Sequence, residues 1–339
     1  AFGYVQAMPH EMSTSEAEKI IDTFGTWAGR VRRGGLDGVE IVVGSYGLIS
    51  QFLHNQSNRR MDKYGGSTLE ERSTFMMEVL QNVRDTLGPD MLLGVRLYDD
   101  LVEYSIGYEE HKIIAKMLDA SGLVDYLNMW IGVSPGEKSI GSHVPPYYHD
   151  PGEFAWRPEK IKELVNLPVI GVGRINAPAL AEEMIATAKM DLVGMVRELI
   201  ADPQFPNKAK EGRVADVRTC IACNQSCAGR GSALGLPITC IYNPVTGHEK
   251  LWADPGPAKV KKKVVVVGGG PAGMEAARVA AERGHQVVLF ERTDRLGGMV
   301  KLAMLPPMRD SYEEIILFGE RQLAKLAVDV RLRLEADVK

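Results

Sequence analysis

The chain has 339 residues, of which 45% are hydrophobic, and 40 basic side chains against 44 acidic ones give a net charge of −4. This balance lacks the basic surface of nucleic-acid-binding proteins, and no apolar run predicts a signal peptide or a membrane span. We therefore expect a soluble, cytoplasmic protein of two or more domains that acts on a small molecule, and a homo-oligomer is compatible with these features.

Helical and strand-like patterns alternate through residues 1–215. Ser13-x-x-Glu16 and Ser67-x-x-Glu70 are predicted capping boxes, each of which opens a helix. The expected helices cover residues 13–33, 67–87, 109–120, 158–165 and 178–187. Short apolar runs predict strands over residues 38–43, 91–97, 125–130, 168–172 and 191–195.

Five strands that alternate with helices predict a parallel α/β fold. One architecture is a (β/α)8 TIM barrel whose first three strands are missing from this sequence, and the alternative is an open doubly wound sheet. The barrel is favoured because barrels often bind phosphate in the loops after their last two strands. Here these loops end in Gly173-Arg174 and Val196-Arg197, which suit the phosphate of flavin mononucleotide (FMN). A salt bridge on the barrel rim is the alternative for either arginine.

Arg96 stands near the end of the second predicted strand. In that place its guanidinium would favour the negative charge that develops on a flavin ring during reduction. A buried ion pair is the alternative.

All four cysteines fall in one window with the spacing C-x2-C-x3-C-x12-C, at Cys220, Cys223, Cys227 and Cys240. Three close thiols and one distant thiol favour a [4Fe–4S] cluster, because a tight loop supplies three corners and a later segment the fourth. Zinc and disulfides are the alternatives, although zinc ribbons usually show two C-x2-C pairs.

A glycine fingerprint follows the strand-like run at residues 263–267 and predicts the start of a Rossmann-like fold. Gly268 permits the turn, Gly270 lets the backbone approach a pyrophosphate, and Gly273 allows close packing of helix on strand. Glu291 ends the next predicted strand, where it would accept hydrogen bonds from a ribose. The expected contacts to FAD or ADP also include Ala272, Arg292 and Gly298.

The motif Asn58-Arg59-Arg60-Met61-Asp62-Lys63-Tyr64-Gly65-Gly66-Ser67 resembles the signature of the old yellow enzyme family. The cysteine and glycine motifs resemble its iron–sulfur branch, which contains 2,4-dienoyl-CoA reductase and trimethylamine dehydrogenase. The resemblance implies an FMN barrel, a [4Fe–4S] cluster and an adenine-flavin domain, with electrons passing from NAD(P)H through FAD, the cluster and FMN to substrate. Family members are longer at both ends, so we expect this sequence to be truncated.

The active-site residues of the family do not transfer cleanly to this sequence. A His-x-x-His or His-x-x-Asn pair is absent after the first predicted strand, and the tyrosine of the dienoyl-CoA reductases aligns with Gly47, one residue from Tyr46. Their catalytic histidine aligns near Ser134. His143 and His149, in the loop 134–154, are the candidate replacements, and a surface histidine is the alternative for each. We take Tyr46 and His143 as the candidate catalytic residues.

The resemblance leaves two reactions open. Asn128 stands where the amine dehydrogenases carry an aspartate, so it cannot help to hold a cationic amine. This favours reduction of an activated C=C bond in an enoate or an enoyl-CoA, with Asn128 as a hydrogen-bond donor to the substrate. Aromatic residues of the loop keep oxidation of a methylated amine as the alternative, and a ferredoxin-like electron carrier is a third possibility. The expected domains are residues 1–215 (FMN barrel), 216–258 (cluster segment and linker) and 259–339 (nucleotide-binding start).

Overall fold

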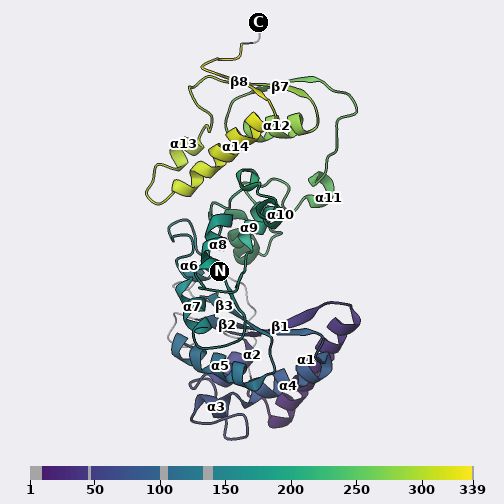
Figure 1. The fold of residues 1–339 in the computed structure, drawn as a ribbon, viewed down its shortest axis with the longest axis vertical. Helices are drawn as coiled ribbons and strands as arrows, with labels where there is room; N and C mark the ends of the chain where they lie inside the picture. The colour runs from purple at the N-terminus through teal and green to yellow at the C-terminus, as the bar shows by residue number, and fades with distance from the viewer. Residues whose placement is uncertain (1–9, 45–46, 100–105, 133–139, 338–339) are drawn as a thin grey trace. The chain divides into compact units, whose positions relative to one another are not determined.

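The computed structural model describes residues 10–44, 47–99, 106–132 and 140–337. The chain divides into two compact units (Figure 1). The first unit comprises residues 1–145, 151–175 and 179–194, and the second comprises residues 146–150, 176–178 and 195–339. Within the described ranges, no helix combines the length and the apolar character that crossing a membrane requires.

The first unit is built on a parallel sheet with the strand order β1-β2-β3-β4-β5. The strands are β1 Gly38–Val43, β2 Leu92–Asp99, β3 Tyr126–Ile131, β4 Val169–Gly171 and β5 Leu192–Val193. This sheet confirms the predicted parallel α/β fold, and all strand ends lie within two residues of the expected positions.

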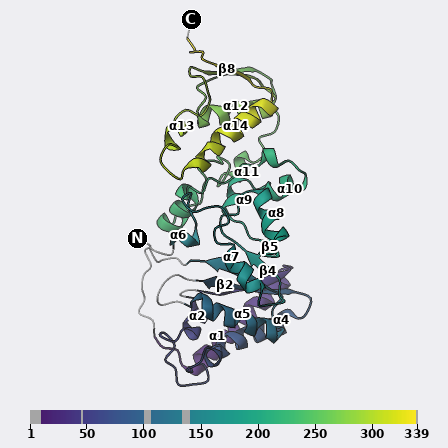
Figure 2. The same cartoon turned by 60° about the vertical axis from the view of Figure 1, so that its left-hand side comes forward.

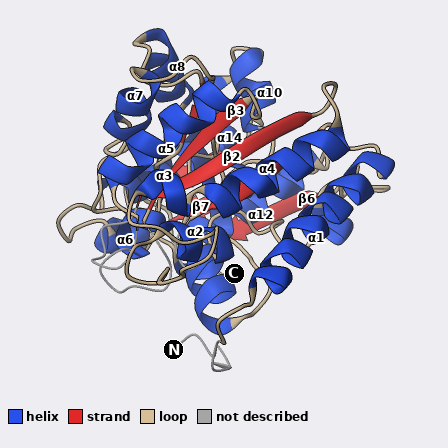
Figure 3. Cartoon of the chain, turned by 90° about the horizontal axis from the view of Figure 1, so that it is seen from below, coloured by secondary structure: helices blue, strands red, loops and turns tan. Residues whose placement is uncertain are grey.

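The helices of the first unit are α1 Thr14–Arg33, α2 Leu48–Leu53, α3 Leu69–Arg72, α4 Thr74–Leu87, α5 Tyr108–Ser121, α6 Ile140–His143, α7 Trp156–Lys162 and α8 Pro178–Ala186. The two views of Figures 2 and 3 show helices covering the sheet. Successive side chains of a strand point to opposite faces. Val95, Leu97, Leu127 and Met129 are therefore buried on the helix-covered face, and their neighbours along the chain form the other face.

The capping boxes set where two helices begin. The Ser13–Glu16 box is present at α1, as predicted. The second box was predicted one residue too early, because Thr68 caps Glu71 instead of Ser67 capping Glu70. The Glu71 carboxylate accepts hydrogen bonds from the backbone N–H groups of both Ser67 and Thr68, which makes Thr68 the better-placed cap. The expected helix is also interrupted at Ser73, between α3 and α4.

The signature motif at residues 58–67 has a structural role in this chain. The buried Asn58 amide donates to the backbone oxygens of Phe52 and Tyr64, at 2.5 and 2.7 Å. Tyr64 packs edge-on against Phe75, and its hydroxyl donates to Glu78 on α4 at 2.8 Å. These hydrogen bonds hold the segment that follows α2 against helices α2 and α4.

The second unit contains a three-stranded parallel sheet of order β6-β7-β8, with β6 Lys263–Val267, β7 Gln286–Glu291 and β8 Asp329–Leu332. Its α-helices are α9 Arg197–Ala201, α10 Phe205–Lys210, α11 Glu249–Trp252, α12 Pro271–Glu282, α13 Val300–Ala303 and α14 Glu313–Lys325. Short 3-10 helices cover Val214–Asp216 and Asp310–Tyr312, and a π-helix covers Gln225–Ala233. The β6–α12–β7 order is the predicted Rossmann-like start.

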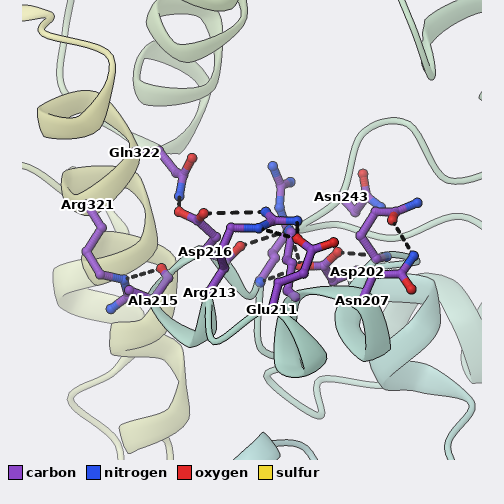
Figure 4. A network of polar contacts seen from close by, with 12 residues as sticks. Asp202, Asn207, Glu211, Arg213, Ala215, Asp216, Asn243, Arg321 and Gln322 are labelled. Atoms are coloured by element: carbon purple, nitrogen blue, oxygen red, sulfur yellow. Dashed lines mark hydrogen bonds and ion pairs between the residues drawn. The ribbon is translucent and has the colours of Figure 1, made fainter.

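A polar network fixes α14 to the segment that precedes the cysteines (Figure 4). Asp216 accepts hydrogen bonds from Gln322 at 3.2 Å and from Lys325 at 2.5 Å, and Arg321 donates to the Ala215 oxygen at 3.1 Å. Asp202, which is buried, accepts from Lys208 at 2.6 Å. The cysteine segment, residues 216–258, therefore belongs to the same unit as strands β6, β7 and β8.

The role of Asn58 gives a testable prediction. Asn58→Ala leaves two buried carbonyl groups without donors, so we expect the free energy of unfolding to fall by about 2–3 kcal/mol. Chemical denaturation followed by circular dichroism measures this loss. Asn55→Ala, at an exposed position three residues away, is the matched control and should have little effect. Equal stabilities of the two variants would contradict the structural role.

Candidate functional site

On the other face of the first sheet, three polar side chains from neighbouring strands form a cluster. Glu40 of β1 pairs with Arg96 of β2, with 2.5 Å between Oε1 and Nη2. The other carboxylate oxygen accepts from the Asn128 amide of β3 at 2.9 Å. Arg96 and Asn128 are register partners, which explains why the strands bring them together. We call Glu40, Arg96 and Asn128 the polar cluster. Arg96, which was predicted to lie near a flavin ring, forms the ion pair that was the alternative for it.

Sequence reasoning identified Arg96 and Asn128 but missed Glu40. Each of the three strands carries a polar residue in an otherwise apolar run, and these residues fall near the same height of the parallel ladder. Aligning the predicted strands by that pattern would have found Glu40. The expected hydrogen bond from Asn128 to a substrate stays a prediction, and in the structure this amide donates to Glu40.

An aromatic stack lies beside the polar cluster. The Tyr98, Trp130 and His143 rings are nearly parallel, with centroids 5.6–6.0 Å apart. The Arg96 guanidinium lies 4.8 Å from the Trp130 ring centroid, a cation–π distance. The stack offers a flat aromatic surface at the carboxyl ends of β2 and β3, where α/β barrels carry their chemistry.

The candidate catalytic residue His143 is held in a defined orientation. Its Nδ1 lies 3.0 Å from the Gly132 carbonyl oxygen, and its own carbonyl accepts from the Trp130 indole at 3.4 Å. Because a carbonyl oxygen can only accept, Nδ1 must carry a proton. Nε2 is therefore the ring atom that can exchange a proton with another group.

The other active-site candidates have different settings. Tyr46 and Ser134 lie outside the described residues. His149 belongs to the second unit, where its ring lies 5.1 Å from that of Tyr148. His143 is thus the candidate that the structure places beside the polar cluster.

The two predicted phosphate-binding arginines fall in different units. Gly173 has a φ of 135°, and Arg174 adopts a left-handed backbone with a φ of 54° and is buried. In the second unit, Val196 precedes α9 and Arg197 begins it. The buried Arg197 side chain donates to the Asn224 amide oxygen at 2.8 Å, which connects it to the cysteine loop.

The four cysteines lie in the segment 220–240, which includes the π-helix and whose backbone turns back on itself. Ala222 and Asn224 have φ values of 52° and 56°, which non-glycine residues rarely adopt. The Thr239 N–H donates to the Ser226 oxygen at 3.1 Å, so the distant Cys240 returns beside Cys227. This hydrogen bond brings the backbone before Cys240 back to the backbone before Cys227.

The donor set fits a cluster of thiolate ligands. Backbone N–H groups of Ala222 and Tyr242 donate to the sulfurs of Cys220 and Cys240, both at 3.4 Å, and such bonds tune Fe–S clusters. Burial raises the pKa of the Cys220 thiol to about 12, and it also raises the pKa of the Cys223 thiol, with smaller contributions from Cys227 and Cys240. A buried thiol of this kind becomes a thiolate only when a cation compensates its charge. Among the described residues, no three Cys, His, Asp or Glu side chains lie close enough to share one metal ion.

The glycine fingerprint forms two turns that pack against each other. A Cβ at Gly273 would lie 1.9 Å from the Gly268 oxygen, which explains the glycine where α12 meets β6. A Cβ at Gly298 would lie 2.9 Å from the Gly270 Cα, and the Gly297 N–H donates to the Gly269 oxygen. A Cβ at Gly270 would meet nothing closer than 3.8 Å, and no side chain caps α12. The open space at this helix N-terminus suits an anion.

Glu291 braces this glycine loop. One carboxylate oxygen accepts from the Gly269 N–H at 2.7 Å, and the other accepts from the N–H and hydroxyl of Thr293, both at 2.8 Å. The Thr293 and Gly269 N–H groups hold the pKa of Glu291 below its ordinary value. The oxygen that accepts from Gly269 keeps a second lone pair, so the predicted bond to a ribose stays open. The next residue, Arg292, is exposed.

A cavity of about 510 Å³ lies within the second unit, and most of its lining is apolar. Ile221 and Tyr242 of the cysteine segment, Ala272 of the glycine loop and Phe318 of α14 contribute to its wall. The cavity therefore joins the cysteine segment to the start of α12.

A barrel-type parallel unit, a cysteine loop and a dinucleotide-binding start together define a flavin oxidoreductase. Residues 3–216 match the NADH:flavin oxidoreductase / NADH oxidase family, and the chain belongs to this family. Residues 263–339 match the FAD dependent oxidoreductase family. The assignment confirms the resemblance to the iron–sulfur branch of the old yellow enzymes.

Similar proteins act on different substrates. The chain is 40% identical to an NADH oxidase of Thermoanaerobacter brockii, over 99% of this chain and 51% of the relative. It is 38% identical to an N,N-dimethylglycine/sarcosine dehydrogenase of Chromohalobacter salexigens, over 95% of this chain and 46% of the relative. A 2-naphthoyl-CoA reductase complex superposes with a TM-score of 0.90 at 37% identity, over 96% of this chain and 49% of that one. The chain thus spans about half the length of these relatives.

The brace at Glu291 gives a second prediction. Glu291→Gln places an amide donor against a backbone donor, so we expect a loss of about 2 kcal/mol in unfolding free energy at pH 7. Because the native pKa is lowered, the carboxylate stabilises the fold above its ordinary pKa of 4.5, and this contribution disappears as the pH falls below that value. Denaturation at pH 7 and pH 4 measures both effects. The exposed Asp294→Asn is the control, and a pH-independent deficit in Glu291→Gln would contradict the assignment.

Proposed function

We propose that this chain belongs to an NAD(P)H-dependent flavoenzyme that reduces an activated C=C bond in an enoate or an enoyl-CoA. FMN would bind in the first unit at Arg96, Gly173 and Arg174, and its ring supplies hydride transfer. Arg197 and Val196 stay candidates for its phosphate. The four cysteines would hold a [4Fe–4S] cluster for one-electron transfer, and the glycine loop would hold FAD.

The choice of substrate class rests on the charge of the polar cluster, in which the positive charge of Arg96 compensates the negative charge of Glu40. A cationic amine needs a carboxylate whose charge is not already compensated. Among the described residues, Glu40 is the carboxylate of this cluster, and it is paired with Arg96 and bonded to Asn128. The paired carboxylate favours a neutral or anionic unsaturated substrate.

The residues around the stack suit such a substrate. The Trp130 and Tyr98 rings offer a flat surface for a conjugated system. When both ring nitrogens of His143 carry protons, it can deliver the one on Nε2 while the Gly132 carbonyl accepts from Nδ1. Reduction of an activated alkene needs a proton at one carbon and hydride at the other. The 2-naphthoyl-CoA reductase relative supports this choice of substrate class.

The second candidate is oxidation of a methylated amine. The face of an aromatic ring attracts a cation, so the aromatic stack can also receive a methylated ammonium group, and an N,N-dimethylglycine/sarcosine dehydrogenase is among the similar proteins. The two functions differ in whether the substrate reoxidises or reduces the flavin.

The first functional test uses the full-length protein under anaerobic conditions. Cinnamate-type enoates and enoyl-CoAs should reoxidise the NAD(P)H-reduced flavin, and N-methyl amines should not reduce the oxidised flavin. His143→Ala should slow reoxidation by about 10²-fold or more through loss of the proton donor. His248→Ala, in the second unit, is the control, and Tyr46→Phe and His149→Ala test the other candidates. Rapid reduction by N-methyl amines, with no reoxidation by any alkene, would favour the demethylase.

The cluster assignment has its own test. Cys223→Ser removes one of four ligands, so we expect iron and acid-labile sulfide to fall while FMN stays bound in the first unit. Metal analysis and flavin absorbance measure both. Stoichiometric zinc without iron in the unmodified protein would refute the cluster.

A further inference from the structure

Arg218 is a buried charged side chain that the proposed chemistry leaves without a role. It lies two residues before Cys220, and its exposed fraction is 7%. Burying a guanidinium is costly unless its donors are satisfied, so its contacts define what it does.

The guanidinium joins two parts of the cysteine segment that are distant in sequence. Nη1 donates to the Tyr242 carbonyl, and the N–H of the same Tyr242 donates to the Cys240 sulfur at 3.4 Å. The Arg218 N–H donates to the buried Asp202 carboxylate at 2.9 Å. Arg218 therefore connects the Cys220 end of the segment to the residue that bonds the fourth cysteine.

The same guanidinium also contacts the nucleotide-binding helix. Nη2 donates to the Glu275 carboxylate at 3.2 Å, and Glu275 lies in the first turns of α12, which begins after Gly270. Arg278 pairs with Glu275 at 2.7 Å from the next turn. Glu275 keeps a lowered pKa despite its burial, because the two arginines oppose the effect of burial.

Aromatic rings enclose the remaining faces of the guanidinium. Its carbon lies 4.7 Å from the Phe318 ring centroid and 5.3 Å from the Tyr242 ring centroid. A planar fork between two rings, with donors aimed at a carbonyl and a carboxylate, cannot be reproduced by lysine.

We propose that Arg218 is the positioning residue that holds the Cys240 end of the cysteine segment beside its Cys220 end and connects the cysteine site to α12. If the four cysteines hold an anionic cluster, the positive charge of Arg218 would stabilise the reduced form of that cluster. The inference rests on the proposed [4Fe–4S] cluster.

The test compares three variants of the full-length protein, purified anaerobically. Arg218→Gln should lose at least half of its iron and acid-labile sulfide relative to FMN, and the midpoint potential of the remaining cluster should move to more negative values. Arg218→Lys keeps the positive charge but lacks the planar guanidinium. We therefore expect it to restore the midpoint potential more fully than the iron content. Arg230→Gln is the matched control, because this arginine belongs to the same segment but makes its hydrogen bond to Pro237 at the surface. Metal analysis and a redox titration followed by electron paramagnetic resonance give both readouts.

The outcomes separate the role of Arg218 from the existence of the cluster. Unmodified protein without iron would refute the proposed cluster. An iron-replete unmodified protein, with full iron and an unchanged potential in Arg218→Gln, would overturn only the role of Arg218. Parallel loss of FMN and iron in both Arg218 variants would assign the residue to general stability and would also overturn the positioning role.

Discussion

The first unit depends on the parallel pairing of each strand with the next, from β1 through β5. Parallel strands need crossover helices, and these cover one face of the sheet and bury its apolar side chains there. The alternate side chains are left for the opposite face, and the ladder brings equivalent positions of neighbouring strands together. Arg96 and Asn128 are direct register partners, and Glu40, whose own partner is Gly94, joins them on the same face from two residues earlier along the ladder.

The second unit depends on close backbone approach. A Cβ at Gly273 or at Gly298 would collide with backbone atoms of the glycine loop, so both positions require glycine. Glu291 holds the Gly269 N–H, and α12 then presents an uncapped N-terminus. Since Arg218 contacts both α12 and the cysteine segment, the two proposed cofactor sites of this unit share one packed framework.

Local patterns in the sequence were sufficient to predict most of the fold. Apolar runs gave the strands, and the Ser13–Glu16 box gave the start of α1. The Thr68 cap was missed because two adjacent hydroxyl residues fit the motif, and the choice depends on where the Glu71 carboxylate turns. Strand β8 was not predicted, because Asp329–Leu332 is short and pairs with a strand about 40 residues earlier.

The candidate site was predicted in part for a related reason. Cysteine and glycine spacings are local, so the four thiols and the loop before α12 were recognised from the sequence. Glu40 and Arg218 find partners far along the chain, and the Arg218–Glu275 contact spans 57 residues. No local pattern encodes the Arg218–Glu275 pairing, because tertiary packing selects it.

The polar cluster of the first sheet also constrains how this sequence can diverge. Each strand supplies one member, so replacing Glu40 alone leaves the Arg96 charge without its partner, and replacing Arg96 alone leaves a carboxylate without compensation. Either single step costs more than the exchange of both residues together. Glu40 and Arg96 should therefore change as a pair among descendants of this protein, and a lineage that alters the charge of its substrate must cross that coupled step.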